Sequence, residues 1–430
     1  MKKVLSIMLV MLVFTLTIAL VSCGGDQNHE HSYIAVITAP TCIEQGYTTY
    51  TCDCGESYIY DYVGATGHTF GEWVTLKEST RDEKGFREGY CECGEKTIQT
   101  IDKLKVSNGL DFEMNYSGFQ SYSVIGIGTC NDTYVVIPEV YNGLPVTSIS
   151  NNAFRSCTSL TKIDIPNSVT SIGECAFYDC TLLTSIVIPD SVTSIGEWAF
   201  RDCTSLTNVV IPNSVTSIGE CAFYNCTSLT SIVIPDSVTS ICDNTFTYCT
   251  SLTSIEIPDS VTTIGVGAFS ICTSLTNIDI PDSVTSIRDS AFARCTSLKS
   301  IVIPHSVTGI GQRVFTNCTS LTSIEIPDSV MFIGDYAFNN CSSLISIEIP
   351  DSVTSIRTYT FWGCTSLTSI VIPDSVTSIG RHAFIDCTSL SSIEFEGTVE
   401  QWNAIEFGES WNRDVPTTEV ICSDGKVSLE

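Results

Sequence analysis

Apolar and polar positions recur along the middle of the chain with a period of 23 residues. From Cys157 to Cys387, cysteine appears eleven times at this spacing, and phenylalanine lies three residues before each cysteine, from Phe154 to Phe384. Leucine, isoleucine, proline and valine fill further columns, so that the repeat reads C-x-x-L-x-x-I-x-I-P-x-S-V-x-x-I-G-x-x-A-F-x-x. A fixed period of this length is typical of a solenoid, in which each repeat forms one coil.

The first half of each copy predicts a short strand with one buried face. In the first copy, Ile163 and Ile165 point to the same side, because side chains alternate across a strand. Pro166 ends the strand, since proline lacks the N–H that a ladder needs. The Asp-Ser pair that follows the proline in most copies is expected to form a turn by bonding nearby backbone N–H groups.

The second half of each copy predicts another extended piece and then a corner. Val169 and Ile172 are expected to point inward, and Gly173 allows the chain to change direction. Ala176 and Phe177 are expected in one helical or 3₁₀ turn, with phenylalanine as the buried plug. One coil cannot bury its own apolar edge, whereas stacked coils turn each column into a continuous spine.

These columns resemble the BspA-like leucine-rich repeats, a 23-residue class found on bacterial surface proteins and some protist ones. The resemblance covers the chain from about Val106 to Cys422. It implies a repeat solenoid, a leucine-rich repeat array of short β-strands and short helical or 3₁₀ turns. We therefore expect an N-terminal cap at 106–156, the repeats at 157–395, and a C-terminal cap and tail at 396–430. The family also implies a role in adhesion.

The end of the array is expected to be covered by residues 396–422. The phenylalanine and cysteine columns stop there, Trp402 falls in the column of Ile172, and Trp411 follows. A solenoid needs such a cap, because the last coil otherwise exposes its apolar surface and an unpaired strand edge.

The N-terminus predicts an export signal at 1–23. Lys2 and Lys3 precede an uncharged apolar run from Val4 to Leu20, which suits a signal peptide. The run ends in Leu-Val-Ser-Cys-Gly, which resembles a bacterial lipobox and implies lipidation of Cys23. The alternatives are a plain secretory peptide and an uncleaved anchor. The lipobox implies an exported protein, attached to the bacterial cell envelope or surface by lipid alone.

A separate cysteine-rich module with two degenerate units is expected at 24–105. The first unit carries Cys42, Cys52 and Cys54, with His31 or His68 nearby, and these residues make a plausible tetrahedral Zn²⁺ site. The second unit retains Cys91 and Cys93 but has Arg81 at the position of Cys42. Disulfide bonds are the alternative in an exported chain, and free thiols are a third possibility.

The regular cysteine column is better explained by packing than by disulfide bonds or metal. Neighbouring Cα atoms would lie about 5 Å apart, but their Cβ vectors run parallel, whereas a disulfide needs a dihedral angle of about 90° between sulfurs turned toward each other. We expect buried thiols that hydrogen-bond weakly to the backbone.

The charge of the chain and the absence of catalytic motifs narrow the functional class. The formal net charge is −28, so nucleic acid and anionic lipid surfaces are poor partners. The sequence contains neither a Gly-x-Ser-x-Gly turn nor a phosphate-binding loop, and it predicts no enzyme.

An outward column lies between the two strand isoleucines and holds either a carboxylate or a valine. The carboxylates are Asp164, Glu256, Asp279, Glu325, Glu348 and Glu394. An extended face of this kind suits a large ligand, and we expect extracellular or cell-surface proteins to bind it. The alternatives are a face that is merely solvated, and an envelope scaffold protein that has no soluble ligand.

Overall fold

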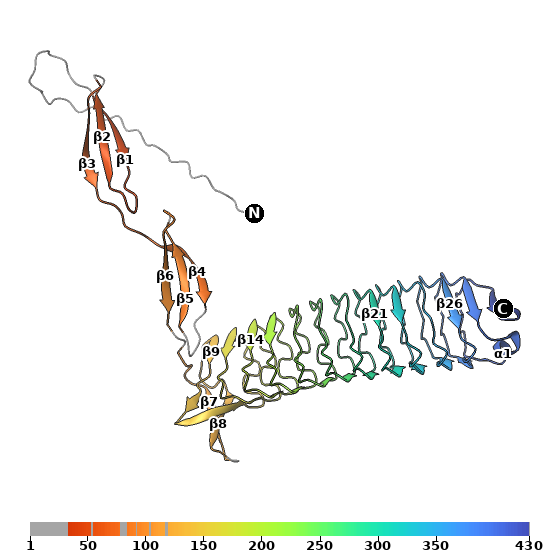
Figure 1. Ribbon diagram of the computed structural model, residues 1–430. Coiled ribbons are helices and arrows are strands. Elements are labelled where there is room, and N and C mark those ends of the chain that lie inside the picture. The colour runs from red at the N-terminus through yellow and green to blue at the C-terminus, as the bar shows by residue number, and fades with distance from the viewer. Residues whose placement is uncertain are drawn as a thin grey trace, which may run out of the picture. The chain divides into compact units, whose positions relative to one another are not determined.

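The computed structural model describes residues 33–52, 55–77, 84–91, 93–102, 105–116 and 119–429. The predicted signal segment with Cys23, and the predicted ligands His31 and Cys54, lie outside these residues. The described chain forms two compact units, which divide immediately before Lys105 (Figure 1). Within the described ranges, no helix has the length and apolar character that crossing a membrane requires.

The first unit contains two antiparallel sheets of three strands each. The strands are β1 (Tyr33–Thr38), β2 (Gly46–Cys52), β3 (Ser57–Val63), β4 (Gly71–Lys77), β5 (Gly85–Tyr90) and β6 (Lys96–Ile101), in the orders β1-β2-β3 and β4-β5-β6. All seven side chains of β3 are exposed. Among the described residues of this unit, the buried hydrophobic side chains are only Cys52 and Cys91. Neither sheet therefore has an apolar core of its own.

The second unit is a solenoid whose coils stack through two parallel ladders (Figure 1). The ladder of the Ile172 column contains β8 (Ser121–Gly126), β11 (Leu144–Ile149), β13 (Ser171–Ile172), β15 (Ser194–Ile195), β17 (Ser217–Ile218), β18 (Ser240–Ile241), β19 (Thr263–Ile264), β20 (Ser286–Ile287), β22 (Gly309–Ile310), β24 (Phe332–Ile333), β25 (Ser355–Ile356), β27 (Ser378–Ile379) and β29 (Glu406–Phe407). The ladder of the Ile163 column contains β9 (Tyr134–Val136), β12 (Lys162–Asp164), β14 (Ser185–Val187), β16 (Asn208–Val210), β21 (Ser300–Val302), β23 (Ser323–Glu325), β26 (Ser369–Ile372), β28 (Ser392–Phe395) and β30 (Glu419–Cys422). The predicted solenoid and its two extended segments per coil are confirmed.

The N-terminal end of the solenoid is covered by antiparallel strands. β7 (Asp111–Asn115) pairs with β8 and lies at the edge of the ladder. β10 (Val140–Tyr141) folds back on β11 through Asn142 and Gly143, whose φ angles are 49° and 81°. An Asn-Gly pair suits this tight hairpin because both positions need left-handed backbone. Residues 140–145 therefore form a tight β-hairpin.

A continuous stack of phenylalanine rings forms the centre of the solenoid. The eleven rings from Phe154 to Phe384 are fully buried. Neighbouring ring centroids lie 5.2–5.8 Å apart, and the ring planes deviate from parallel by at most 13°. Each aromatic pair contributes about 0.5–1.5 kcal/mol beyond the burial of its area. The stack confirms phenylalanine as the buried plug of each coil.

The segment that carries each phenylalanine consists of turns and not of the predicted helical or 3₁₀ turn. Cys175 and Asp179, on either side of Phe177, have φ angles of 53° and 60°, which are incompatible with a right-handed helix. The N–H of Phe177 donates to the Ala199 carbonyl of the next coil at 2.7 Å, whereas the next N–H, that of Tyr178, donates locally to Cys175 at 3.1 Å. Because alternate amides bind the neighbouring coil, the corners also hold the stack together.

The cysteine column packs and hydrogen-bonds as the sequence predicts. From Cys180 to Cys387, each thiol donates to the carbonyl of the phenylalanine 26 residues earlier, at 3.1–3.2 Å. These ten side chains are fully buried. Burial raises the pKa of Cys249, Cys318 and Cys387 to about 12, so that these groups stay protonated at neutral pH.

The Asp-Ser turn after each proline is held mainly by its serine. The Ser191 hydroxyl donates to the Val169 carbonyl of the preceding coil, and the same contact recurs in later coils at 2.5–2.8 Å. The aspartates of this column, such as Asp190 and Asp282, are exposed at the turn. The turn is confirmed, but the serine, not the aspartate, joins it to its neighbour.

The C-terminal cap contains the short helix α1 (Val399–Asn403). Trp402 lies in this helix and not in the Ile172 column, because Phe407 of β29 pairs with Ile379 in its place. The pair is 28 residues apart, five more than the 23 of the repeat, and the helix accounts for the additional residues. Trp402 and Trp411 are buried, and the Trp411 ring closes the phenylalanine stack against Phe384 at 6.1 Å. β31 (Gly425–Ser428) then pairs antiparallel with β30 and covers that ladder's edge.

We expect the ten cysteines from Cys180 to Cys387 to resist alkylation in the native protein and to react fully in denaturant, because they are buried and protonated. Iodoacetamide labelling followed by mass spectrometry measures both states. Cys157, at the start of the column, is only partly buried and is the internal control. Thiols that stay unreactive in denaturant until a reductant is added would contradict the packing role.

We expect Phe269→Ala to lower the free energy of unfolding by about 3–5 kcal/mol, because it opens a cavity within the ring stack. Phe332→Ala is the matched control, since this ring is 46% exposed, and it should cost at most about 1 kcal/mol. Urea unfolding followed by circular dichroism measures both. Equal losses of unfolding free energy in the two variants would show that the ring stack does not contribute more to stability than an exposed ring does.

Candidate functional site

The first candidate site is the strand face, which we define as the outward column between the two strand isoleucines, from Asp164 to Glu394. The valines of this column are exposed, up to 68% at Val233. Parallel pairing places many of these side chains directly beside their counterparts in the next coil, as in the pairs Val302 with Glu325 and Val371 with Glu394. The column is therefore a line of mixed apolar and acidic surface.

Five of the six predicted carboxylates of the strand face are exposed, namely Glu256, Asp279, Glu325, Glu348 and Glu394. Asp164, in β12, is half-buried and less accessible. Glu256 pairs in register with Asp279 and, on its other side, with Val233. Because the neighbouring strands of a sheet lie about 4.8 Å apart, Glu256 and Asp279 form a concentrated negative charge.

Shallow cavities open beside both ladders of the solenoid. A cavity of about 500 Å³ opens beside Glu256 and Asp279 and is lined by residues of two neighbouring coils. A cavity of about 400 Å³ lies on the other ladder, near Arg357 and Glu406. Neither lining contains a histidine, cysteine or lysine.

The two histidines of the array lie at a turn and at a corner of the coils. His305 is exposed at the turn after a proline, as the sequence predicts. His382 is buried, with its ring 5.0 Å from that of Tyr359 and its Nδ1 3.3 Å from the Ser410 carbonyl oxygen. His382 occupies one of the left-handed corner positions, with a φ of 56°.

A surface ladder of arginine and tyrosine was missed by the sequence analysis. Arg155, Tyr178, Arg201 and Tyr224 occupy one column at the 23-residue spacing. The Arg155 guanidinium lies 4.8 Å from the Tyr178 ring, and that of Arg201 lies 4.5 Å from the Tyr224 ring. The alternation of Arg and Tyr in one column is the signal that would have revealed it. Arginine and tyrosine are enriched at protein interfaces, so this ladder is an additional candidate contact surface besides the strand face.

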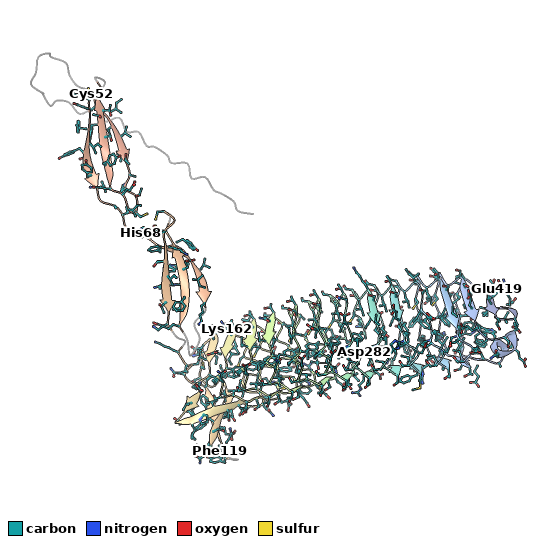
Figure 2. All side chains as sticks on the ribbon, in the orientation of Figure 1. Cys52, His68, Phe119, Lys162, Asp282 and Glu419 are labelled. Atoms are coloured by element: carbon teal, nitrogen blue, oxygen red, sulfur yellow. The ribbon has the colours of Figure 1, made fainter. Side chains whose placement is uncertain are left out.

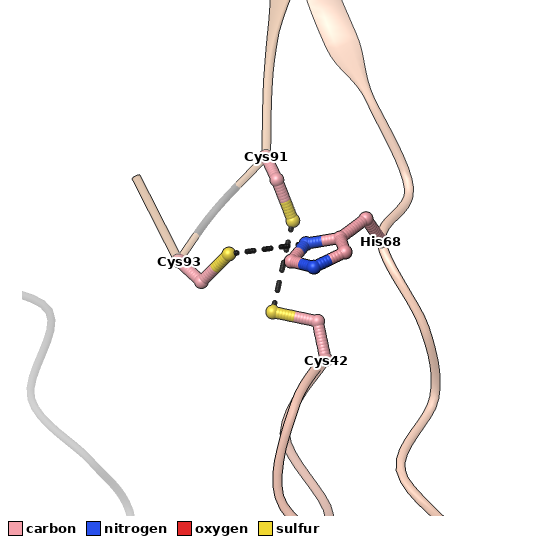
Figure 3. Close-up of side chains that lie close together, drawn as sticks. All are labelled: Cys42, His68, Cys91 and Cys93. Atoms are coloured by element: carbon pink, nitrogen blue, oxygen red, sulfur yellow. Dashed lines mark hydrogen bonds between the residues drawn. The ribbon is translucent and has the colours of Figure 1, made fainter. Parts of the chain in front are cut away.

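The second candidate site is a cluster of three cysteines and one histidine in the first unit (Figure 3). It contains Cys42 and His68, both predicted as metal ligands, together with Cys91 and Cys93 of the second sheet's hairpin. Cys52 lies at the far end of the first sheet from His68 and is not part of the group (Figure 2), and Cys54 lies outside the described residues. The cluster thus combines residues of both degenerate sequence units, all within the first compact unit, where the sequence suggested a site within the first degenerate unit.

The ligand atoms of the cluster lie close enough to share one ion. The Cys91 and Cys42 sulfurs are 3.7 Å apart, and the Cys93 sulfur lies 3.4 Å from Nδ1 of His68. All four ligand atoms lie within 4.8 Å of one another. The backbone N–H of Cys93 and the His68 ring lower the pKa of the Cys91 thiol to about 6, whereas a hydrogen bond with the Cys93 sulfur raises that of Cys42 to about 11.

A family model described as the BspA type leucine rich repeat region matches this chain at residues 129–253, 175–299, 216–343 and 285–412. No curated protein matches the chain.

Several solved structures are similar to the chain. A leucine-rich cell surface protein from Faecalibacterium prausnitzii is 33% identical, covering 71% of this chain and 98% of its own, with a TM-score of 0.44. A leucine-rich repeat protein from Bacteroides ovatus is 28% identical, covering 71% of this chain and 99% of its own, with a TM-score of 0.47. A leucine-rich repeat protein from T. pallidum is 25% identical, covering 56% and 91%, with a TM-score of 0.37.

Proposed function

Because the chain belongs to the BspA-type leucine-rich repeat family, we propose that it is a non-catalytic, surface-anchored protein that binds other proteins through its strand face. The observation that carries this proposal is the exposed column of valines and carboxylates, which runs along one side of the solenoid. Protein interfaces typically combine a buried apolar centre with charged groups around it. Burial of the apolar groups contributes affinity, and the charges contribute specificity for the partner.

The charge of the array indicates what kind of partner fits. Between Cys157 and Phe395 there are 22 acidic and 8 basic residues, so the array attracts basic surfaces. Five of these acidic residues are exposed carboxylates of the strand face, and the valines of the same column offer an apolar contact. The proposed ligands are therefore extracellular or cell-surface proteins with a basic and apolar binding region, and the proposed role is adhesion.

Attachment to the cell surface is proposed to occur through the lipid on Cys23. The apolar run before Cys23 matches a signal peptide, and the residues around it match a lipobox. One lipid anchor leaves the whole array outside the bilayer, where a large partner can reach it.

We expect reversal of the strand-face charges, by Glu256→Lys, Asp279→Lys, Glu325→Lys and Glu348→Lys together, to weaken binding about tenfold or more, because charge complementarity is lost. The thermal unfolding midpoint should stay unchanged, since these side chains are exposed. A screen of the chain against extracellular-matrix and bacterial surface proteins identifies the ligand, and surface plasmon resonance then compares the variants.

The matched control reverses four exposed aspartates of the turn after the proline, one in each of the same coils, by Asp259→Lys, Asp282→Lys, Asp328→Lys and Asp351→Lys. It changes the net charge equally but leaves the strand face intact. Equal weakening in both variants would mean that only net charge matters. Unchanged binding in the first variant would remove the strand face from consideration. Recovery of no ligand, together with self-association of the chain, would favour an envelope scaffold.

We expect Cys23→Ser to release the protein from the membrane fraction, because the lipid then has no attachment atom. Metabolic labelling with a palmitate analogue, followed by cell fractionation, measures lipid attachment and location together. Retention of both the label and the membrane association in the variant would refute the anchor.

A further inference from the structure

We propose that Cys42, His68, Cys91 and Cys93 bind one Zn²⁺ ion, and that this ion joins the two sheets of the first unit. The four residues come from three separate segments, the β1–β2 loop, the linker between β3 and β4, and the end of β5 with its following turn (Figure 3). The inference is independent of the proposed ligand-binding face on the solenoid.

The spacing of the ligand atoms matches a tetrahedral zinc site. With Zn–S bonds of about 2.3 Å and Zn–N bonds of about 2.0–2.1 Å, the ligand atoms of a tetrahedron lie about 3.5–3.8 Å apart. The separations of 3.7 Å between the Cys42 and Cys91 sulfurs and 3.4 Å between the Cys93 sulfur and Nδ1 of His68 agree with this spacing. Bonded disulfide sulfurs lie about 2.05 Å apart. Three thiolates and one imidazole also favour zinc over calcium or magnesium, which prefer oxygen ligands.

The backbone around the cluster holds the ligands in place. The Cys91 N–H donates to the Glu95 carbonyl at 2.8 Å, and the Gly94 N–H donates to the Cys91 carbonyl at 2.9 Å, which closes a tight hairpin. Gly94 has a φ of 91°, which glycine adopts without strain. On the other side of the site, the Thr66 N–H donates to the Thr41 carbonyl at 3.0 Å, next to Cys42 and two residues before His68.

The first unit has few other sources of stability. Its buried hydrophobic side chains, within the described residues, are two cysteines, and most residues of β1 and all of β3 are exposed. A three-stranded sheet with no buried apolar face is marginally stable in water. A structural zinc ion supplies the missing free energy, because its binding is coupled to folding.

The shared site also accounts for the difference between the two degenerate units. The Cys52 hairpin repeats the geometry of the Cys91 hairpin, with Cys52 N–H bound to the Glu56 carbonyl at 2.7 Å and a Gly55 φ of 94°. In the proposed site, Cys42 comes from the first degenerate unit and His68 from the linker, and both bind the same ion as the Cys91 hairpin of the second degenerate unit. No third Cys-x-Cys-Gly hairpin follows the second degenerate unit, and this unit carries Arg81 where the first has Cys42.

The test measures zinc in the intact chain purified under reducing conditions without chelator, by mass spectrometry of the metal. We expect the double variant Cys91→Ser with Cys93→Ser to lose about one zinc ion per chain, because a tetrahedral site keeps its metal only with its full ligand set. Cys52→Ser should retain that ion. His68→Ala should lose it and His68→Cys should keep it, since a fourth thiolate restores a tetrahedral set.

Two further readouts separate ligand loss from general misfolding. Replacement of the metal by Co²⁺ should give the intense visible bands of tetrahedral cobalt and a thiolate-to-cobalt charge-transfer band in the wild-type chain. Hydrogen exchange at Thr66 should slow when metal is bound, while exchange in the solenoid stays the same. Zinc content that is unchanged in the Cys91 and Cys93 variant, a zinc ion lost through Cys52→Ser alone, an octahedral cobalt spectrum, or a Cys42–Cys91 disulfide in the chain isolated without reductant would each overturn the proposal.

Discussion

The solenoid depends on one constraint, which is that no coil can bury its own apolar edge. Phe269 is fully buried only because Phe246 and Phe292 lie against its two faces, at 5.6 and 5.5 Å. The strict 23-residue period keeps every such ring in register, together with the ladders and the thiol-to-carbonyl bonds. Residues that face inward are therefore fixed, and outward residues such as Val371 and Glu394 differ between neighbouring coils.

The inward columns made most of the solenoid predictable from the sequence, because each column has one chemical type and one environment. The corners were not predictable in the same way. Their left-handed positions hold Cys175, Trp198 and His382 where glycine would have signalled the conformation, and it is the bond to the next coil that holds these residues there. The prediction that Trp402 lies in the Ile172 column was also wrong. The cap contains five additional helical residues, and Phe407 takes that column position instead.

The Cys/His cluster shows a different limit of sequence reasoning. Alignment of the two degenerate units assigns equivalent roles to equivalent residues, so Cys42 was grouped with Cys52 and Cys54. The structure takes unlike residues from each unit, Cys42 from one and Cys91 with Cys93 from the other. Residue types and spacing identified two of the four members, but only the placement of the hairpins identified the rest. The strand face was easier to predict, because the alternation of a strand directly determines which side chains point outward.

The thiol column has a consequence for how the array loses structure. Each coil packs mainly on its two neighbours, so opening begins at the ends and proceeds one coil at a time. Every coil that detaches exposes the thiol that had donated to its neighbour's carbonyl, and no thiol deeper in the stack becomes accessible before it. The reactivity of these thiols therefore reports fraying of the solenoid. The order in which its cysteines become reactive records how far, and from which end, the solenoid has opened.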